Sequence, residues 1–448
     1  MASIFFLIDH KHRDLPISIS IGSNLEKLGI NVHYYPINDK NIEKDISLIE
    51  PDAIVIPKPN FNQSETFFWK LKGIKLIVVE TEGNHQDKNV VYRVFNKPSL
   101  YLTWNHEVAN LYKKIFKNQT TVKVCGFHRG DLLHKSFRSI FGQRDDNLLS
   151  LNLDPNNFNI TIATSTHISH LSKSRLEKQS QRRKAKFSSI TDIYDIFENQ
   201  LMLRNMTEEL ISKLLEVPDI NIILKPHPNE NVIYWNKYIK NLNNPRIKLL
   251  TNQSINYLLT FSDLHIAHNV CTTTIEAMMM DIPAIELHGS LARNLYKKEH
   301  LELANICSED TDNIYKKIIQ IKNKDLKFND AKIKLDEYVA KYFFKFDGMR
   351  SHHYAKEIVR FLDSNNEDSK FLFAIKNLHI LIFLLIIKIK NFIVNFFGRK
   401  KRIDEINNPT NRLSNVTKIN DVLVDKEFGL SDNRCDTDDI AFWKNKFS

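Results

Sequence analysis

The sequence predicts an α/β protein built from two doubly wound domains that face each other across a cleft. Short, continuous apolar runs alternate with helix-like stretches, which is typical of parallel strands buried under helices. The alternation stops over about 142–158, where the residues are polar and rich in Asn, Asp and Pro, and then it starts again. A chain of 448 residues is also long for a single domain.

The first domain is expected over residues 1–148. Its expected strands are 4–9, 32–35, 53–56, 76–80, 100–103 and 122–125, with helices at 64–72 and 106–116 among the connections. The opening apolar run has the length of a strand and neither a basic segment nor a cleavage site, so no signal peptide is expected.

The second domain is expected over residues 156–362. Its expected strands are 160–164, 220–225, 247–251, 264–268 and 284–288. A long insertion after the first strand is basic over 173–186 and helix-like over 192–216. An amphipathic helical region over 330–362 is broken at Phe346-Asp347-Gly348, where glycine supplies a turn.

The composition changes again after residue 363. Residues 371–402 combine a very apolar stretch with interspersed lysines and a closing Arg399-Lys400-Lys401-Arg402 cluster. The uncharged core of this stretch is shorter than the roughly 20 apolar residues that span a bilayer. We therefore expect an amphipathic helix lying on the anionic inner leaflet, with a buried helix of the second domain as the alternative. Residues 403–448 are expected to be a flexible tail.

Charge and cysteine content narrow the class of protein. The net charge of +10 suits an anionic substrate or membrane, and no nucleic-acid-binding module is present. The four cysteines are scattered without the spacing of a metal site or a disulfide framework, which suits a reducing compartment. We expect a cytoplasmic protein, peripherally bound to the membrane, that needs no metal and no cofactor.

The most informative stretch follows the expected strand 264–268. His268 and Asn269 end this strand, and Thr272, Thr273 and Thr274 then open a helix that carries Glu276 in its first turn. Free N–H groups and the helix dipole make such a helix start an anion site, and three hydroxyls add donors. An ordinary helix cap is the simpler interpretation, but the triplet favours phosphate binding.

A second signal is the Lys-Pro-His-Pro run at 225–228. Two prolines stiffen the turn after a buried strand and fix the direction of His227. An imidazole held there can donate to a phosphate oxygen or protonate a leaving group, and Lys225 adds positive charge. Ser165 ends the preceding strand and is expected to be a donor beside the same cleft.

The first domain offers candidates for the acceptor side. Glu80 and Glu82 follow the buried strand 76–80, and a carboxylate there can deprotonate an acceptor hydroxyl, although both can also be solvated loop residues. His10, Lys11 and Arg13 follow the first strand, where they can bind an anionic acceptor or form part of a solvated loop. Arg129 lies in a later turn that can contact the donor.

Taken together, these motifs resemble the bacterial surface carbohydrate biosynthesis proteins, and more broadly the GT-B glycosyltransferases of capsule and lipopolysaccharide synthesis. The resemblance covers about residues 1–362. It rests on the motifs at 9–14, 80–83, 126–131, 225–228, 268–277 and 347–348.

The resemblance to bacterial sialyltransferases and related CMP-sugar enzymes implies specific roles. Glu82 would be the base, His227 the phosphate ligand and acid, and Thr272 and Thr273 phosphate contacts; Glu276 would contact the ribose. Thr81 stands where relatives have a first acid, so Glu80 remains an alternative base.

The function expected from this resemblance is inverting transfer of a sugar from a nucleotide donor, CMP-linked, to a glycan or lipid-linked acceptor. CDP-glycerol transferases share the His-Pro signature, so a glycerophosphotransferase is one alternative. A UDP-sugar epimerase on the same fold and a non-catalytic scaffold of polysaccharide assembly are the others.

Overall fold

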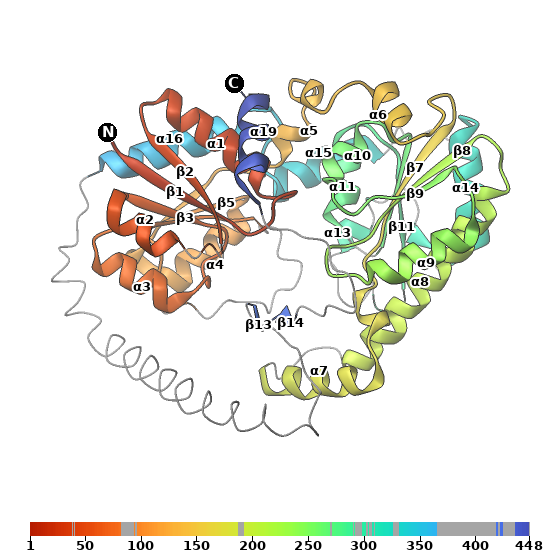
Figure 1. Ribbon diagram of the computed structural model, residues 1–448, viewed down its shortest axis with the longest axis horizontal. Helices are drawn as coiled ribbons and strands as arrows, with labels where there is room; N and C mark the ends of the chain where they lie inside the picture. The colour runs from red at the N-terminus through yellow and green to blue at the C-terminus, as the bar shows by residue number, and fades with distance from the viewer. Residues whose placement is uncertain are drawn as a thin grey trace, which may run out of the picture.

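The computed structural model describes most of the chain, with gaps. The described residues are 1–37, 39, 41–81, 94, 96–186, 192–268, 271–289, 291, 298–301, 303, 307–308, 310–325, 331–364, 418–419, 422–423 and 435–447. Two lobes, each built around one sheet, lie side by side (Figure 1). The predicted site residues Glu82 and Asn269 and the predicted membrane helix 371–402 lie outside the described residues.

The first lobe contains a six-stranded parallel sheet in the order β2-β1-β3-β4-β5-β6. Its strands are β1 (Ser3–Ile8), β2 (Asn31–Pro36), β3 (Ala53–Ile56), β4 (Lys75–Val79), β5 (Leu100–Thr103) and β6 (Thr121–Val124). The helices between them are α1 (Leu15–Lys27), α2 (Ile42–Ile49), α3 (Gln63–Leu71), α4 (His106–Phe116) and the 3-10 turn η1 (Lys117–Gln119).

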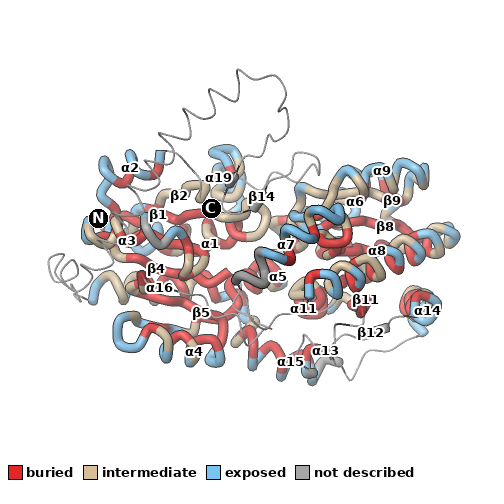
Figure 2. The backbone as a smooth tube through the Cα atoms, turned by 90° about the horizontal axis from the view of Figure 1, so that it is seen from below, coloured by how far each residue is buried: buried red, intermediate tan, exposed pale blue. Residues whose placement is uncertain are grey.

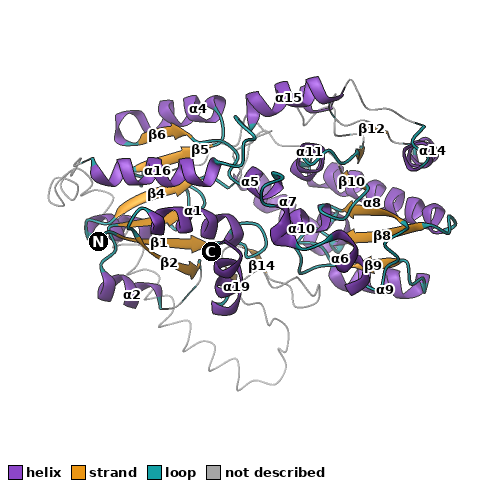
Figure 3. Cartoon of the chain, turned by 90° about the horizontal axis from the view of Figure 1, so that it is seen from above, coloured by secondary structure: helices purple, strands orange, loops and turns teal. Residues whose placement is uncertain are grey.

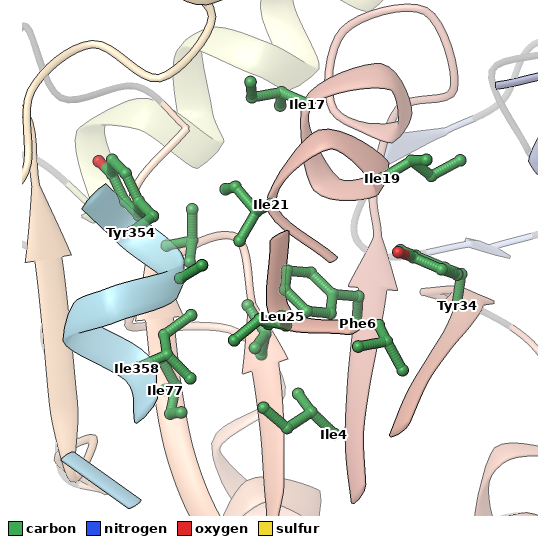
Figure 4. Close-up of a cluster of buried hydrophobic side chains, with 14 of the residues drawn as sticks. Ile4, Phe6, Ile17, Ile19, Ile21, Leu25, Tyr34, Ile77, Tyr354 and Ile358 are labelled. Carbon is green, nitrogen blue, oxygen red and sulfur yellow. The ribbon is translucent and has the colours of Figure 1, made fainter. Parts of the chain in front are cut away.

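Side-chain alternation along the strands gives this sheet two apolar faces. Ile4 and Phe6 of β1 point to the face covered by α1, whereas Phe5 and Leu7 point to the face covered by α2, α3 and α4. On the first face the helix α16 (Arg350–Asp363) lies beside α1 and contributes side chains to the same cluster (Figure 4). The strands therefore lie buried between two helical layers, as continuous apolar runs predict.

The second lobe repeats this architecture with the order β12-β11-β10-β7-β8-β9. Its strands are β7 (Phe158–Ala163), β8 (Ile220–Lys225), β9 (Ile247–Leu249), β10 (Leu264–His268), β11 (Ala284–Leu287) and β12 (Cys307–Ser308). Its helices are η3 (His167–His170), α7 (Lys173–Lys186), α8 (Ile193–Leu215), α9 (Val232–Leu242), α10 (Ile255–Leu259), α11 (Thr272–Met279), α13 (Lys298–Leu301), α14 (Thr311–Lys322) and α15 (Ala331–Tyr342).

Helices cover both faces of the second sheet, as the view in Figure 3 shows. One apolar cluster joins the strands to α8, α9 and α14 and includes the fully buried Trp235. The opposite face packs on α10 and α11. In both lobes the strands are buried and the outer helix faces are exposed (Figure 2). The predicted α/β class with two parallel sheets is confirmed.

The lobes are joined by the segment between β6 and β7 and by a shared apolar cluster. The segment contains α5 (Gly130–Leu133), η2 (Arg138–Phe141) and α6 (Arg144–Ser150). Trp104 and Phe127 of the first lobe pack in one cluster with Ile275 and Met278 of α11 and with Tyr342 of α15. This shared core fixes how the two strand edges face each other.

The chain then returns to the first lobe at α16. Asp131 accepts hydrogen bonds from the backbone N–H groups of Arg350 (2.9 Å) and Ser351 (2.6 Å), which caps the start of this helix. Gly348 precedes it with φ of +68°, and an added Cβ would lie 2.7 Å from the His134 ring. The motifs at 126–131 and 347–348 therefore meet in space and hold the returning helix.

A short helix, α19 (Thr437–Phe447), lies within the segment expected to be a flexible tail. It packs on α1, where Trp443 and Phe447 join the apolar cluster of the first lobe. Lys444 pairs with Glu26 of α1 at 3.0 Å, and Asp439 pairs with Lys11 at 3.4 Å. The last residues are thus part of the folded first lobe. Among the described residues, no helix is long and apolar enough to cross a membrane.

Candidate functional site

The strand orders place a topological switch point in each sheet. In the first sheet the chain goes from β1 to β2 on one side and then to β3 on the other; in the second it leaves β7 for β8 and β9 and returns beside β7 as β10. Ligands of open α/β sheets bind at the carboxyl ends of strands at such points. The loops after β1, β7, β8 and β10 are therefore the expected site, and they contain most of the predicted residues.

His227 follows β8 and points out of the second sheet edge. The backbone N–H of Asn229 donates to His227 Nδ1 at 3.2 Å, so the proton of the neutral ring lies on Nε2. The ring is solvent-exposed and sits 5.8 Å, centroid to centroid, from the ring of His167. Surrounding protein atoms, with His167, Lys225 and Arg13, lower the pKa of His227 to about 3. A neutral N–H donor is therefore presented at neutral pH.

The carboxylate of Glu230 ties the loops after β7 and β8 together. It is fully buried and accepts from Thr164 Oγ1 (2.8 Å), Thr166 N (2.7 Å) and Thr166 Oγ1 (3.1 Å), and from Trp235 Nε1 (2.7 Å). Its own N–H donates to the carbonyl of His227 at 2.8 Å. Sequence reasoning did not identify Glu230, although a carboxylate three residues after a predicted site histidine was a usable signal.

Lys225 ends β8 beneath this turn. Its Nζ donates to the carbonyl of Thr251 at 2.8 Å. Desolvation lowers the pKa of Lys225 to about 8, and Glu230 offsets part of this effect. Burial is the main cause that lowers the pKa values of His10 and His12 in the loop after β1, and the charge of Lys225 adds to both shifts.

The three threonines at the start of α11 do not act as a uniform triplet. Thr273 Oγ1 donates to Cys271 Sγ at 3.2 Å and lies 2.9 Å from Nε2 of the buried His265, and Thr274 is fully buried. Thr272 is partly exposed, and its hydroxyl has no partner in the described part of the chain. Thr272 and the first-turn N–H groups of α11 are therefore the donors that a ligand can reach.

Both ring nitrogens of His268 have partners within the protein. Its Nδ1 accepts the Ser165 N–H at 3.1 Å, and its Nε2 lies 2.6 Å from the Thr207 hydroxyl. The Thr207 proton goes to the carbonyl of Leu203 at 2.8 Å, so the ring donates from Nε2 and is neutral. Burial lowers the pKa of His268 to about 3. The structure thus gives His268 the role of fixing Ser165 and the loop after β7.

In the first lobe, the turn after β1 presents a compact basic group. Arg13 donates to Asp14 from Nε (2.7 Å) and Nη2 (3.0 Å), and the same guanidinium influences His227 across the lobes. Burial alone would raise the pKa of Asp14, but Arg13 lowers it overall. Lys11 turns away toward Asp439. Of the three predicted residues in this turn, His10 and Arg13 thus lie on the side of the second lobe.

Arg129 connects the lobes below the predicted site. Its guanidinium lies 3.6 Å from Glu276 of α11 and 5.7 Å from the ring centroid of Trp104. Glu276 is buried, and Asn256 donates to it at 3.3 Å. Burial raises the pKa of Glu276, and Arg129 opposes that shift. Both side chains therefore carry an interlobe contact at the base of α11.

The two candidate bases differ in what the structure shows. The Glu80 carboxylate is buried and accepts a hydrogen bond from the Tyr101 hydroxyl, and its backbone carbonyl accepts from Trp104 Nε1 at 2.8 Å. Glu80 is therefore bonded to residues of its own lobe. Glu82 is not among the described residues. No group of three metal-ligating side chains occurs among the residues that are described.

Comparison with known proteins rests on structure. No protein-family model matches the chain, and no curated protein matches it in sequence. The UDP-GlcNAc 2-epimerase of Methanocaldococcus jannaschii, solved with UDP-GlcNAc and UDP, is similar with a TM-score of 0.50 at 15% identity, over 80% of this chain and 99% of that one.

Two further solved structures are similar over the same extent. The S. aureus MnaA–UDP structure has a TM-score of 0.53 at 12% identity, over 82% of this chain and 99% of that one. The wall teichoic acid polymerase TagF, soaked with CDPG, has a TM-score of 0.50 at 11% identity, over 82% of this chain and 90% of that one. At these identities the likeness establishes the fold, which is GT-B.

Proposed function

We propose that this chain is a metal-independent glycosyltransferase of surface polysaccharide synthesis that uses a nucleotide-activated sugar. The observation that carries the proposal is His227: it follows β8 at the carboxyl edge of the second sheet, is exposed, and carries the proton of its neutral ring on Nε2. The structural likeness to proteins solved with UDP, UDP-GlcNAc and CDPG supports a nucleotide-linked substrate.

The donor phosphate would lie between His227 and the start of α11. Both follow strands that flank β7, so they are separated by about two strand spacings, roughly 10 Å. That span fits a phosphate approached from either side by the His227 N–H and by Thr272 with the helix-terminal N–H groups. A CMP-linked sugar is the proposed donor, on the resemblance of the Lys-Pro-His-Pro and threonine motifs.

The proposed reaction is a single in-line displacement. The acceptor hydroxyl gives its proton to Glu82, its oxygen bonds to the anomeric carbon, and the bond from that carbon to the phosphate oxygen breaks with its electrons. The neutral His227 ring stabilises the leaving phosphate as a hydrogen-bond donor. It can serve as an acid only where the bound phosphate raises its pKa. The buried contacts of Glu80 favour Glu82 as the base.

A nucleotide screen tests the proposal. Thermal shift with CMP, CDP, UDP and GDP should show a cytidine nucleotide raising the melting temperature of the wild type but not of His227→Ala. Glu82→Gln should bind the nucleotide normally and abolish transfer. If no nucleotide stabilises the wild type, the scaffold alternative replaces the enzyme.

The second candidate is an epimerase of a UDP-sugar, favoured by the structural similarity to the UDP-GlcNAc 2-epimerase of Methanocaldococcus jannaschii. It predicts stabilisation by UDP rather than cytidine nucleotides, and conversion of UDP-GlcNAc in the absence of any acceptor. A response to CDP together with turnover of CDP-glycerol would instead indicate a glycerophosphotransferase.

We also propose that residues 371–402 hold the enzyme on the anionic inner leaflet, near a glycan or lipid-linked acceptor. Replacing Leu381, Leu384 and Leu385 by Glu in the full chain should abolish co-flotation with vesicles containing anionic lipid. Unchanged flotation would contradict the anchor and leave the catalytic proposal standing.

A further inference from the structure

The turn after β1 contains two imidazole rings, each with a buried Nε2 atom that has no hydrogen-bond partner among the described residues. The rings of His10 and His12 lie 6.0 Å apart, and the backbone N–H of His12 donates to His10 Nδ1 at 3.3 Å. This bond puts the proton of the neutral His10 ring on Nε2. Within the described residues, Nε2 of His10 and Nε2 of His12 are both buried and have no hydrogen-bond partner.

Such an arrangement is uncommon in a folded protein. A buried donor that has lost water and gained no acceptor is costly, so native structures keep few of them. Two neighbouring rings in one turn, at the switch point of the first sheet, each leave Nε2 without a partner among the described residues. An acceptor atom of a ligand would satisfy the His10 N–H.

The charges around these rings determine what kind of ligand fits. The three nearby cations of the first lobe each have a carboxylate partner: Arg13 lies 2.7 Å from Asp14, Lys11 lies 3.4 Å from Asp439 and Lys58 lies 3.8 Å from Asp9. Lys225 of the second lobe is different. In the part of the chain that is described, no carboxylate lies within ion-pair distance of its Nζ.

Lys225 acts electrostatically on both rings. Burial is the largest cause that lowers the pKa values of His10 and His12; Arg13 adds to the shift of His10, and the charge of Lys225 adds to both shifts. The rings therefore stay neutral, and Lys225 supplies a positive charge that has no ion-pair partner among the described residues. The His10 N–H, the neighbouring His12 ring and an ammonium are the chemistry of an oxyanion site.

We infer that His10 and His12 of the first lobe and Lys225 of the second lobe together bind one oxyanion, a phosphate or a carboxylate. The identity of the ligand rests on the proposed function: the oxyanion is either the phosphate of the nucleotide donor or an acidic group of the acceptor. Because both Nε2 atoms are closed off from solvent in this arrangement, the anion enters as the lobes move apart.

Calorimetric titration of the full chain with inorganic phosphate, alone and at saturating CMP, tests the site. His10→Asn keeps an oxygen where Nδ1 accepts the His12 backbone N–H but removes Nε2, and His12→Asn removes the Nε2 atom of the second ring. We expect the double variant to lose phosphate affinity by about tenfold or more. His10→Gln, which restores a donor near Nε2, should recover part of it.

His33→Asn is the matched control, because His33 of β2 also has a buried Nε2 without a partner among the described residues but lies outside this turn. It should bind phosphate as the wild type does. For the wild type itself, ¹⁵N-histidine spectra should show the Nε2 signals of two rings shifting on phosphate addition, so the test does not depend on a variant folding.

Titration with phosphate at saturating CMP and titration with CMP itself distinguish the two possible sources of the anion. Weaker phosphate binding at saturating CMP in the double variant supports an acidic acceptor, and weaker binding of CMP itself supports the donor phosphate. Wild-type affinity for both ligands in the folded double variant overturns the inference, as does a wild type that does not bind phosphate. Failure of the wild type to bind any nucleotide contradicts the proposed function alone, since the phosphate arm still tests this site.

Discussion

Replacing Glu230 by Gln should destabilise the second lobe and weaken nucleotide binding. Each carboxylate oxygen of Glu230 accepts from an N–H group that can only donate: Thr166 N at 2.7 Å on Oε1 and Trp235 Nε1 at 2.7 Å on Oε2. Gln has one oxygen and one NH2 group, so in either orientation one of these donors faces another donor. The threonine hydroxyls can rotate, but the backbone and indole N–H groups cannot.

The size of the effect follows from this count. Hydrogen bonds to a charged group contribute about 1.5–3 kcal/mol each, and an unsatisfied buried donor costs about 1–3 kcal/mol. Gln also removes the desolvation cost that raises the pKa of Glu230, which offsets part of the loss. We therefore expect the free energy of unfolding to fall by about 2–4 kcal/mol, which is the cost of one lost charged bond and its unsatisfied donor less that offset.

Denaturant unfolding and nucleotide titration measure the two effects separately. The matched control is Glu209→Gln on α8, an exposed glutamate that pairs with Lys213, for which a change below about 1 kcal/mol is expected. Because Glu230 holds the loops that carry His167 and His227, nucleotide affinity should fall in Glu230→Gln and stay constant in the control. If both variants unfold alike and bind nucleotide alike, the Glu230 carboxylate neither stabilises the second lobe nor positions the loops that bind nucleotide.

Three further outcomes are expected. Burial lowers the pKa of His128 and His268 to about 3 and that of His265 to about 4, from the ordinary 6.5. As the pH falls below 6.5, the unfolded chain therefore takes up protons before the folded protein does. Equilibrium unfolding should show full stability above pH 6.5 and, below it, a loss of up to about 1.4 kcal/mol per pH unit for each ring. A flat profile between pH 6.5 and 4 would contradict buried neutral histidines. Phosphate affinity should decline as pH rises through the Lys225 pKa of about 8, and Lys225→Met should show weak binding without this decline; an unchanged pH profile in that variant would assign the charge elsewhere. Trp443→Ala should lower stability by about 1–3 kcal/mol by unpacking α19, whereas the neighbouring Phe442→Ala, which removes a 54% exposed ring, should change it little; equal effects would refute the docking of α19.

Much of the fold was predictable because buried parallel strands have a distinct pattern. The run at 220–225 matches β8 at both ends, and the run at 264–268 matches β10. The short β12 was not predicted, since two residues at a sheet edge carry no periodic signal. The docking of α19 was also missed, because an asparagine-rich segment precedes it and its apolar residues contact α1 far away in sequence.

The site was predicted less completely, for a physical reason. The position of a polar residue after a strand indicates the sheet edge, but not whether its side chain faces a ligand or the protein. His268 and Thr273 were grouped with the ligand contacts, yet their side chains bond Ser165 and His265 within the lobe. Glu230, by contrast, was passed over, because its partners come from a different strand loop.

The central claim is that a nucleotide phosphate binds at the carboxyl edge of the second sheet, against His227. Calorimetric titration of CMP into the wild type, His227→Ala and the control His106→Ala, which alters an exposed residue at the start of α4, tests it most directly. We expect the wild type and the control to bind CMP alike and His227→Ala to lose affinity by about tenfold or more. Equal affinity in all three proteins, or no binding of CMP by the wild type, would contradict it.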